Sequence, residues 1–215
     1  MDSAAFVRRK TAVAAPPLVP EIRLHLATEV TPIWQATEET LAHSALPPPF
    51  WAFAWAGGQA LARYLLDHPA EVAGRSVLDF GAGSGLVAIA AAKAGGALVL
   101  AAEIDDFAAA AIAANAQLNG AAIDVTTEDL LDTVDPRWEV VTAGDVCYER
   151  PMADRVTGWL RRLAARGPLV LIGDPGRAYL PSEGLVERAR YLVPVSRELE
   201  DRDTRDTIVW EVLPR

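Results

Sequence analysis

Cysteine is almost absent from this sequence, and no part of it forms a long hydrophobic run. Cys147 is the only cysteine among 215 residues, which excludes an internal disulfide and a zinc site built from several cysteines. The histidines, His25, His43 and His68, lie far apart without metal-ligand spacing, so we predict no metal site. No stretch approaches the roughly 18 uncharged apolar residues of a membrane span. With 51% apolar and 23% charged residues, the chain is expected to fold around a core.

Basic residues are also scarce, because 20 lysines and arginines face 29 aspartates and glutamates, a net charge of −9. This balance argues against a nucleic-acid partner, since proteins that bind duplex DNA usually carry a basic stripe. The excess is local: residues 101–150 hold 11 acidic and 2 basic side chains. We predict that this block surrounds the functional site and attracts a cationic segment of a partner.

Two groups of prolines divide the chain into an N-terminal extension, residues 1–50, and a main domain, residues 51–215. The first group begins at Pro16 and the second occupies residues 47–49. We interpret the start of the extension as a frayed helix rather than a transit peptide, because it is short and contains an acid. Alternating apolar side chains at residues 22–26 predict a half-buried strand. The arginine- and alanine-rich composition leads us to expect a cytoplasmic protein.

Strand and helix patterns alternate from residue 75 onward. Predicted strands cover residues 76–80, 97–102, 122–126, 139–143, 168–172, 191–199 and 207–213. Predicted helices cover residues 86–94, 107–118, 154–165 and 184–189, and a charged link at 200–206 joins the last two strands. Together with the family resemblance described below, this order predicts an α/β fold with a doubly wound, Rossmann-like sheet of seven mostly parallel strands. Helices cover both faces, and the sheet ends in a C-terminal antiparallel hairpin.

Residues 77–85 (VLDFGAGSG) join a predicted strand to a helix through a glycine-rich turn. Its three glycines permit left-handed backbone and let a nucleotide-like ligand approach the helix N-terminus. The G-x-G-x-G spacing differs from the G-x-G-x-x-G of dinucleotide sites. Asp79, just before the glycines, suits a cationic ligand such as S-adenosylmethionine and disfavours a pyrophosphate. A tight turn capped by Ser84 is the alternative interpretation.

Two acidic positions follow the next two strands. Glu103 ends the second strand, 22 residues after Gly81, where an acid can accept hydrogen bonds from ribose hydroxyls. Asp129 follows the third strand and is a candidate contact for an adenine amino group. An ordinary helix cap explains Asp129 equally well. The turn and Glu103 together favour a cofactor site.

From about Pro47 to its end, the sequence resembles the class I S-adenosylmethionine-dependent methyltransferases. The resemblance implies that the glycine loop binds the methionine part of the cofactor and that Glu103 binds its ribose. Asn115 and Asn119 look like asparagines that support this fold. The predicted cofactor-binding residues are Trp55, Asp79, Gly81, Ala82, Gly83, Gly85, Glu103, Ile104, Asp129 and Leu130.

A narrower resemblance rests on residues 50–59 (FWAFAWAGGQ), 145–148 (DVCY) and 172–177 (IGDPGR). Together these segments are similar to the protein-lysine methyltransferases that modify the β-subunit of electron transfer flavoprotein. The ribosomal protein L11 methyltransferases share the cofactor half. The Asn/Asp-Pro-Pro-Tyr/Phe element of enzymes that methylate amides or adenine is absent, so those nitrogens are poor substrate candidates.

Asp145 and Tyr148 are the predicted catalytic residues. Asp145 follows a central strand, where ligands of open α/β sheets bind, and we predict that its carboxylate aligns the incoming lysine amine. Tyr148 and Trp55 are predicted to line the amine channel or cover the cofactor, because aromatic faces attract ammonium groups. Trp51 is a candidate for the same roles, but both tryptophans lie in an apolar stretch that is more often part of a core, and Cys147 is interpreted as a small buried filler.

The sequence therefore predicts a monomeric protein-lysine N-methyltransferase that uses S-adenosylmethionine and acts on the electron transfer flavoprotein β-subunit. A ribosomal-protein, small-molecule or RNA methyltransferase of the same fold, or a module without catalysis, is the alternative. Asp174 is either a second substrate-side carboxylate or part of a turn.

Overall fold

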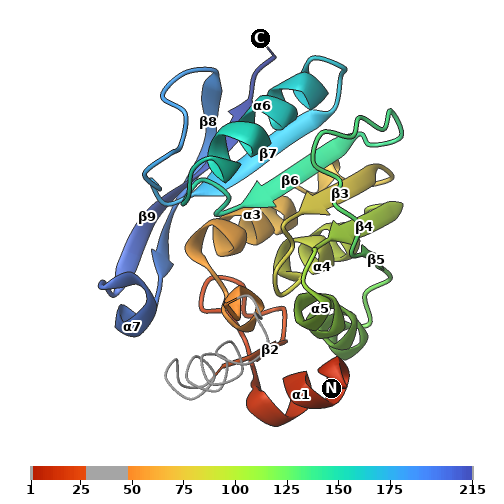
Figure 1. Cartoon of the computed structure of the whole chain (residues 1–215), viewed down its shortest axis with the longest axis vertical. Coiled ribbons are helices and arrows are strands. Elements are labelled where there is room, and N and C mark those ends of the chain that lie inside the picture. Colours follow the sequence, from red (N-terminus) through yellow and green to blue (C-terminus); the bar gives the residue numbers. More distant parts are fainter. Residues whose placement is uncertain (1, 28–47, 215) are drawn as a thin grey trace.

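The computed structural model describes residues 2–27 and 48–214, and its centre is a seven-stranded sheet (Figure 1). The strand order is β5-β4-β3-β6-β7-β9-β8. The strands are β3 (Ser76–Phe80), β4 (Leu98–Ala102), β5 (Asp124–Thr126), β6 (Val140–Gly144), β7 (Leu169–Asp174), β8 (Leu185–Pro194) and β9 (Thr204–Val212). Strands β3 to β7 run parallel, whereas β9 is antiparallel to both β7 and β8. The predicted fold class is confirmed.

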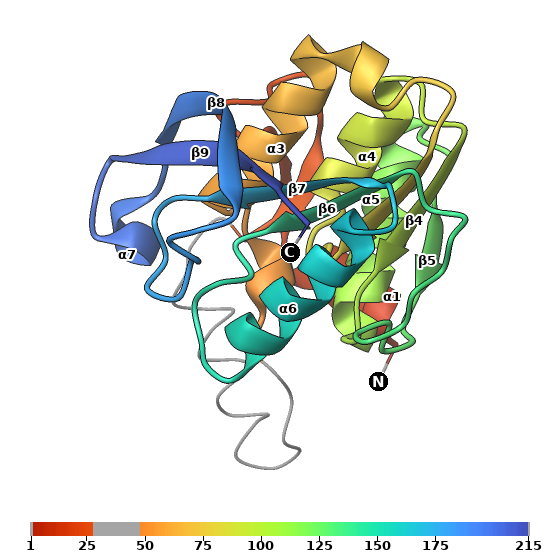
Figure 2. The ribbon, with the colours of Figure 1, turned by 90° about the horizontal axis from the view of Figure 1, so that it is seen from above.

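Helices cover both faces of the sheet, because neighbouring residues of a buried strand point to opposite sides. Val77 packs with helices α3 (Ala56–Asp67), α4 (Leu86–Lys93) and α5 (Asp106–Asn119). Its neighbour Leu78 packs on the other side, with helix α6 (Met152–Ala164). Figure 2 shows α6 on the side of the sheet opposite α3 and α4.

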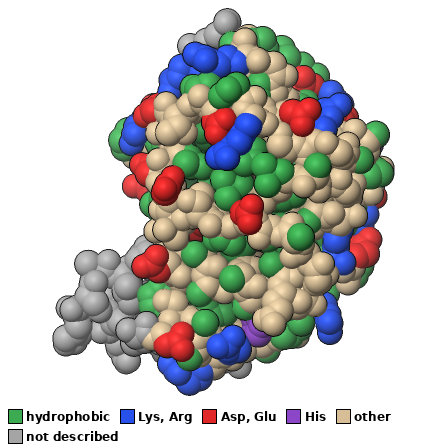
Figure 3. Space-filling view, turned by 90° about the vertical axis from the view of Figure 1, so that its right-hand side faces the viewer, with side chains coloured by type: hydrophobic (Ala, Val, Ile, Leu, Met, Phe, Trp, Pro, Cys, Tyr) green, Lys and Arg blue, Asp and Glu red, His purple; other side chains and the backbone are tan. Residues whose placement is uncertain are grey.

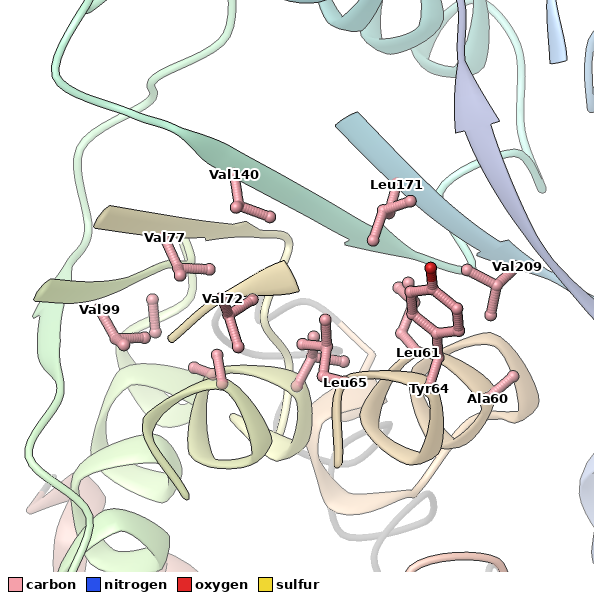
Figure 4. Close-up of a cluster of buried hydrophobic side chains, with 14 of the residues drawn as sticks. Ala60, Leu61, Tyr64, Leu65, Val72, Val77, Val99, Val140, Leu171 and Val209 are labelled. Atoms are coloured by element: carbon pink, nitrogen blue, oxygen red, sulfur yellow. The ribbon is translucent and has the colours of Figure 1, made fainter. Parts of the chain in front are cut away.

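Aliphatic side chains fill the space between the sheet and α3. Val77, Val99, Val140, Leu171 and Val209, from five strands, point toward the helices below the sheet; Leu171 and Val209 lie over α3, and Val77 and Val99 over α4 (Figure 4). On the helix side, Leu61 and Leu65 are fully buried and Tyr64 is nearly so. Strands this apolar on both faces suit the middle of a parallel sheet, which explains why they were found from sequence within about two residues.

The described part of the N-terminal extension packs against the main domain. Helix α1 (Ser3–Lys10) begins at Asp2, whose side chain accepts the N–H groups of Ala4 and Ala5. Its Phe6 ring contacts Phe107 of α5, with the ring centroids 5.0 Å apart. Strands β1 (Ala12–Ala14) and β2 (Leu24–Leu26) form a separate antiparallel pair. The predicted helix and strand are thus present, while residues 28–47, including His43, lie outside the described residues.

Two asparagines tie the extension to the glycine loop. Asn115 accepts the N–H of His25 at 2.7 Å and donates its amide to the carbonyl of Ser84 at 2.8 Å. Asn119 accepts the N–H of Arg23 and donates to the carbonyl of the same residue. Their predicted role in supporting the fold is confirmed.

The prediction of a helix at residues 184–189 is wrong. The segment is the first half of β8, and the predicted strand 191–199 ends at Pro194. Helix α7 (Arg197–Glu200) then lies in the connection to β9. Ala189, Tyr191 and Val193 point inward while their neighbours point outward, and β9 supplies the hydrogen-bond partners. Pairing with a distant strand therefore overrides the local helix preference of this segment.

Candidate active site

The candidate residues gather at the carboxyl ends of the parallel strands, the edge to which their arrowheads point in Figure 1. Phe80, the last residue of β3, is in register with Ala102 of β4 and with Ala143 of β6. Gly144 is in register with Gly173 of β7. The loops that follow these strands are therefore neighbours, as expected at the ligand-binding edge of an open α/β sheet.

The glycine loop leaves room beside two of its three glycines. Gly81, Gly83 and Gly85 all have positive φ angles, of 65°, 52° and 79°. A Cβ atom on Gly81 would have only a Val146 methyl group at 3.7 Å, and one on Gly83 only the Trp51 backbone at 4.0 Å. This open surface fits a ligand that lies against the backbone.

Gly85 serves packing instead, because a Cβ atom there would lie 3.1 Å from a methyl group of Ile112 in α5. It also occupies the N-cap position of α4, without a side-chain cap. The helix cap that the alternative interpretation assigned to Ser84 is therefore absent. The N–H groups of Gly81 and Ala82 donate to the carbonyl of Ala102, which holds the loop against β4.

Asp79 is buried beneath the loop rather than exposed in it. One carboxylate oxygen accepts the Thr142 hydroxyl at 2.9 Å, and the other accepts the N–H of Ala88 at 3.1 Å. Burial raises the pKa of Asp79 to about 7, against the lowering effect of these two donors. Asp79 thus joins β3 to β6 and to α4, and its contact with the cofactor stays a prediction.

Glu103 lies beside the glycine loop, as the spacing predicted. Its Oε2 accepts the N–H of Gly83 at 3.0 Å, while its Oε1 lies at a longer distance, 3.4 Å, from the N–H of Asp105. Burial raises the pKa of Glu103 above its ordinary value. The neighbouring Ile104 is 68% exposed. An under-used carboxylate oxygen next to an exposed apolar side chain suits a ribose hydroxyl and an adjoining base.

Asp129 is exposed, and its carboxylate accepts the N–H of Leu131 at 2.9 Å. No helix starts here, so the alternative interpretation as a helix cap is wrong, and the contact is that of a local turn. Leu130 is half-buried against the α6 side of the core. An adenine contact by Asp129 stays a prediction.

Asp145 is the most constrained residue of the site. Its backbone has a φ of 56°, and its N–H donates to the carbonyl of Gly173 at 2.9 Å. Its Oδ2 accepts the N–H of Gly58 at 3.1 Å. Its Oδ1 accepts two N–H groups of Arg177, at 2.8 and 3.2 Å. Burial raises the pKa of Asp145 to about 6, although the Arg177 guanidinium acts in the opposite direction.

Sequence reasoning did not assign a role to Arg177. Its guanidinium also donates to both oxygens of Glu200, at 2.7 and 3.2 Å, and it lies 5.8 Å from the centre of the Trp55 ring. Arg205 donates to the same Glu200 carboxylate at 2.9 Å. We call Asp145, Arg177 and Glu200 the acid–arginine network. The sequence did contain a signal for the pairing of Arg177 with Asp145. An acid that is largely buried at a sheet edge requires a cation, and Arg177 follows the adjacent strand.

Asp174 is part of a turn, as one of its two interpretations predicted. Its Oδ1 accepts the N–H groups of Gly176 and Arg177, at 2.7 and 2.6 Å. Its Oδ2 is buried and has no hydrogen-bond partner among the described residues. Burial raises the pKa of Asp174 above its ordinary value.

Aromatic side chains form the rim of the site. The Trp55 indole donates to the carbonyl of Phe50 at 2.8 Å, and the Phe50 ring lies 5.7 Å from the Tyr148 ring. Tyr148 is 51% exposed, and the charge of Glu103 helps to raise its pKa after burial and Glu149. Tyr148 thus belongs to the same aromatic cluster as Phe50 and Trp55.

Two neighbouring residues behave as structural parts. Trp51 is buried among the α1 and α5 side chains, so its interpretation as a core residue is confirmed. Cys147 is fully buried, and burial raises the pKa of its thiol to about 12, which confirms a buried filler.

Within residues 2–27 and 48–214, no group of three histidine, cysteine or acidic side chains could hold a metal ion. No helix in the same ranges is long and apolar enough to cross a membrane.

Solved structures share this fold. A magnesium protoporphyrin IX methyltransferase from Synechocystis with bound S-adenosylhomocysteine aligns with a TM-score of 0.54 and 18% identity, over 73% of this chain and 81% of that one. A ribosomal protein L11 methylase from Lactobacillus delbrueckii subsp. bulgaricus aligns with a TM-score of 0.53 and 23% identity, over 76% and 81%. A family model described as ribosomal protein L11 methyltransferase matches residues 60–145. The fold and the glycine-loop site thus define a class I methyltransferase.

Curated relatives narrow this class. The electron transfer flavoprotein beta subunit lysine methyltransferase of Xenopus laevis is 38% identical over 98% of this chain and 87% of its own length. The human protein of the same name is 36% identical over 98% of this chain and 82% of its own length. This chain belongs to the family of electron transfer flavoprotein beta subunit lysine methyltransferases.

Proposed function

We propose that this protein transfers a methyl group from S-adenosylmethionine to lysine side chains of the electron transfer flavoprotein β-subunit. Family membership supports the reaction and the substrate. The observation in the molecule that carries the proposal is the position of Asp145, a carboxylate that is only 11% exposed and lies at the same sheet edge as the glycine loop and Glu103. A carboxylate so placed can accept a hydrogen bond from an amine.

The residues around the glycine loop fit the cofactor. The surface beside Gly81 and Gly83 is open to a ligand, and Glu103 retains an acceptor oxygen for a ribose hydroxyl. Exposed Ile104 and half-buried Leu130 offer apolar surface to a base. When bound there, S-adenosylmethionine supplies a methyl group on a sulfonium, which only an uncharged amine can accept.

The chain's own residues would bind and align the lysine. The pKa of a free lysine side chain is about 10.4, so the amine must lose a proton before it can react. Asp145 accepts a hydrogen bond from the amine and directs it, while Tyr148 and Trp55 enclose the aliphatic stem and exclude water. Positioning of this kind is the main contribution that an enzyme makes to a group transfer.

A ribosomal-protein substrate has less support. The matching family model covers residues 60–145, which hold the glycine loop and Glu103 but neither Tyr148 nor Arg177. A ribosomal protein L11 methyltransferase of Caldicellulosiruptor bescii is 42% identical, but over only 34% of this chain. The match to the family model thus lies in the cofactor half, which says little about the substrate.

Labelled S-adenosylmethionine incubated with purified electron transfer flavoprotein β-subunit tests the proposal, with peptide mass spectrometry to locate the label. We expect label on lysine. The Asp145→Ala variant should lose transfer but retain affinity for S-adenosylhomocysteine in calorimetry. Asp124→Ala, an exposed acid at the start of β5, serves as the matched control. Label confined to another protein would refute the substrate, and full activity of Asp145→Ala would refute the assigned role.

We further propose a monomeric, cytoplasmic protein without a nucleic-acid partner, which light scattering and cell fractionation would test.

The acidic block, residues 101–150, attracts a cationic segment less strongly than its net charge in the sequence suggests, because ion pairs neutralise part of that charge. Asp132 pairs with Arg155 and Arg162, and Asp135 pairs with Arg137. Figure 3 shows acidic and basic side chains interspersed on one face. A slower reaction at high salt would support residual steering.

A further inference from the structure

The carboxylate proposed to receive the lysine amine already holds a guanidinium. We propose that Arg177 is a positioning and specificity-determining residue that makes the site select the neutral amine of the substrate lysine over its ammonium form. The inference rests on the proposed function, because it concerns the same reaction at the same carboxylate. It assigns Arg177 a task that acts through Asp145.

The Arg177 guanidinium is a fixed part of the site and not an exposed surface ion pair. The side chains of Arg177, Asp145 and Glu200 are 19%, 11% and 3% exposed. Arg177 makes two hydrogen bonds to Asp145 and two to Glu200. Its backbone N–H is held by Asp174 at 2.6 Å. Because both the side chain and the backbone are held, an incoming substrate meets Arg177 in place.

Charge explains what this arrangement would do. An unpaired buried carboxylate favours an ammonium ion, which has no lone pair and cannot accept a methyl group. An amine that approaches the paired Asp145 also approaches the guanidinium, and a nearby like charge disfavours protonation. Asp145 retains acceptor capacity for an N–H of a neutral amine, because a carboxylate has about four lone-pair sites.

Other ionisable groups lie around the pair. From β7, Asp174 faces Asp145, and its negative charge acts against the effect of Arg177, while burial raises the pKa of Asp174 and so favours its neutral form. From α7 and β9, Glu200 and Arg205 form a second opposite-charge pair. Burial and the negative charges of Asp174 and Asp145 raise the pKa of Cys147 to about 12, so Cys147 stays a thiol. Helix α3 contributes only the N–H of Gly58.

The pH dependence of kcat distinguishes this role from a structural one. The Arg177→Gln variant removes the charge, so the bound amine should hold its proton more tightly. We expect kcat at pH 7 to fall about tenfold or more and the rising limb of the kcat profile to move about one pH unit or more to alkaline values. The KM for the protein substrate should stay the same or fall. Arg177→Lys should restore much of the wild-type profile.

Arg205→Gln is the matched control, because Arg205 contacts Glu200 but makes no hydrogen bond to Asp145. Its kcat profile should keep the wild-type shape. Circular dichroism and S-adenosylhomocysteine affinity would establish that Arg177→Gln folds and retains its cofactor side. A loss of activity that is equal at every pH would assign Arg177 a structural role and overturn the inference.

The wild-type enzyme supplies an independent measurement. Its kcat should reach a plateau well below the free lysine pKa of about 10.4. A profile that rises with unit slope to about pH 10 overturns the inference even if the variants do not fold. Absence of labelled lysine with wild-type protein refutes the proposed function and removes the inference with it. Normal wild-type transfer with an unshifted Arg177→Gln profile refutes the inference alone.

Discussion

Asp79 should make this protein less stable as the pH rises from 5 to 8. Asp79 is 2% exposed, no cationic side chain pairs with it among the described residues, and burial raises its pKa from 3.8 to about 7. A carboxyl group whose pKa is higher in the folded state contributes stability below its unfolded pKa and loses it as the pH passes the folded value. The Asp79→Asn variant removes this dependence.

The magnitude follows from the shift. Each pKa unit corresponds to about 1.36 kcal/mol, so the ionisation of Asp79 costs about 4 kcal/mol of folding free energy well above pH 7. Between pH 5 and pH 8 the difference is roughly 2–3 kcal/mol. Asparagine fits the same space: its oxygen can accept the N–H of Ala88, and its amide can donate to the Thr142 hydroxyl, which rotates to accept.

Urea unfolding of both proteins at several pH values, followed by circular dichroism, measures the effect. The free energy of unfolding of the wild type, minus that of Asp79→Asn, should fall by roughly 2–3 kcal/mol from pH 5 to pH 8. Thr142→Val should steepen the wild-type decline, because its hydroxyl lowers the pKa of Asp79. In the Asp79→Asn background, Thr142→Val should leave the pH dependence unchanged. Parallel wild-type and Asp79→Asn curves would refute this account of Asp79.

Three further measurements test the packing around the site. Gly57→Ala should destabilise the protein by about 1–3 kcal/mol or more in urea unfolding, because its Cβ would overlap the carbonyl oxygen of Gly173. Gly58→Ala, with open space beside it, is the control, and equal costs would contradict the argument. Leu61→Ala should cost about 2–5 kcal/mol in the same assay, since Leu61 is fully buried, and a cost below about 1 kcal/mol would show that the core there collapses. Cys147 should resist Ellman's reagent at pH 8 until denaturant is added, because the thiolate is the reactive form, and rapid native labelling would show that the thiol is accessible.

Local patterns were sufficient for the main features of the fold. The strands β3, β6 and β7 are short runs of Val, Leu and Ile, and burial on both faces leaves such a sequence few alternatives. The glycine turn was equally local, because the positive φ angles at Gly81 and Gly83 favour glycine. The role of Glu103 was predicted from its spacing to the glycine loop, since the length of the strand before it determines where that strand ends.

The C-terminal hairpin shows where local pattern fails. Residues 184–189 contain good helix formers, yet β8 pairs with β9 along most of its length. The pairing energy comes from a strand that follows later in the chain, so the sequence of the segment itself carried too little information. The same limit applies to Asp79, whose burial depends on Thr142 and on α4.

By itself, then, the sequence determined the parallel sheet, the glycine loop and the acid that faces it, because each depends on residues close together in the chain. Only the tertiary structure decided the charge state of the proposed amine site. Asp145, Arg177 and Glu200 come from three separate segments, and their hydrogen bonds exist only where β6, β7 and α7 meet. The energy of a buried charge depends on its neighbours in space, and no local pattern reports them.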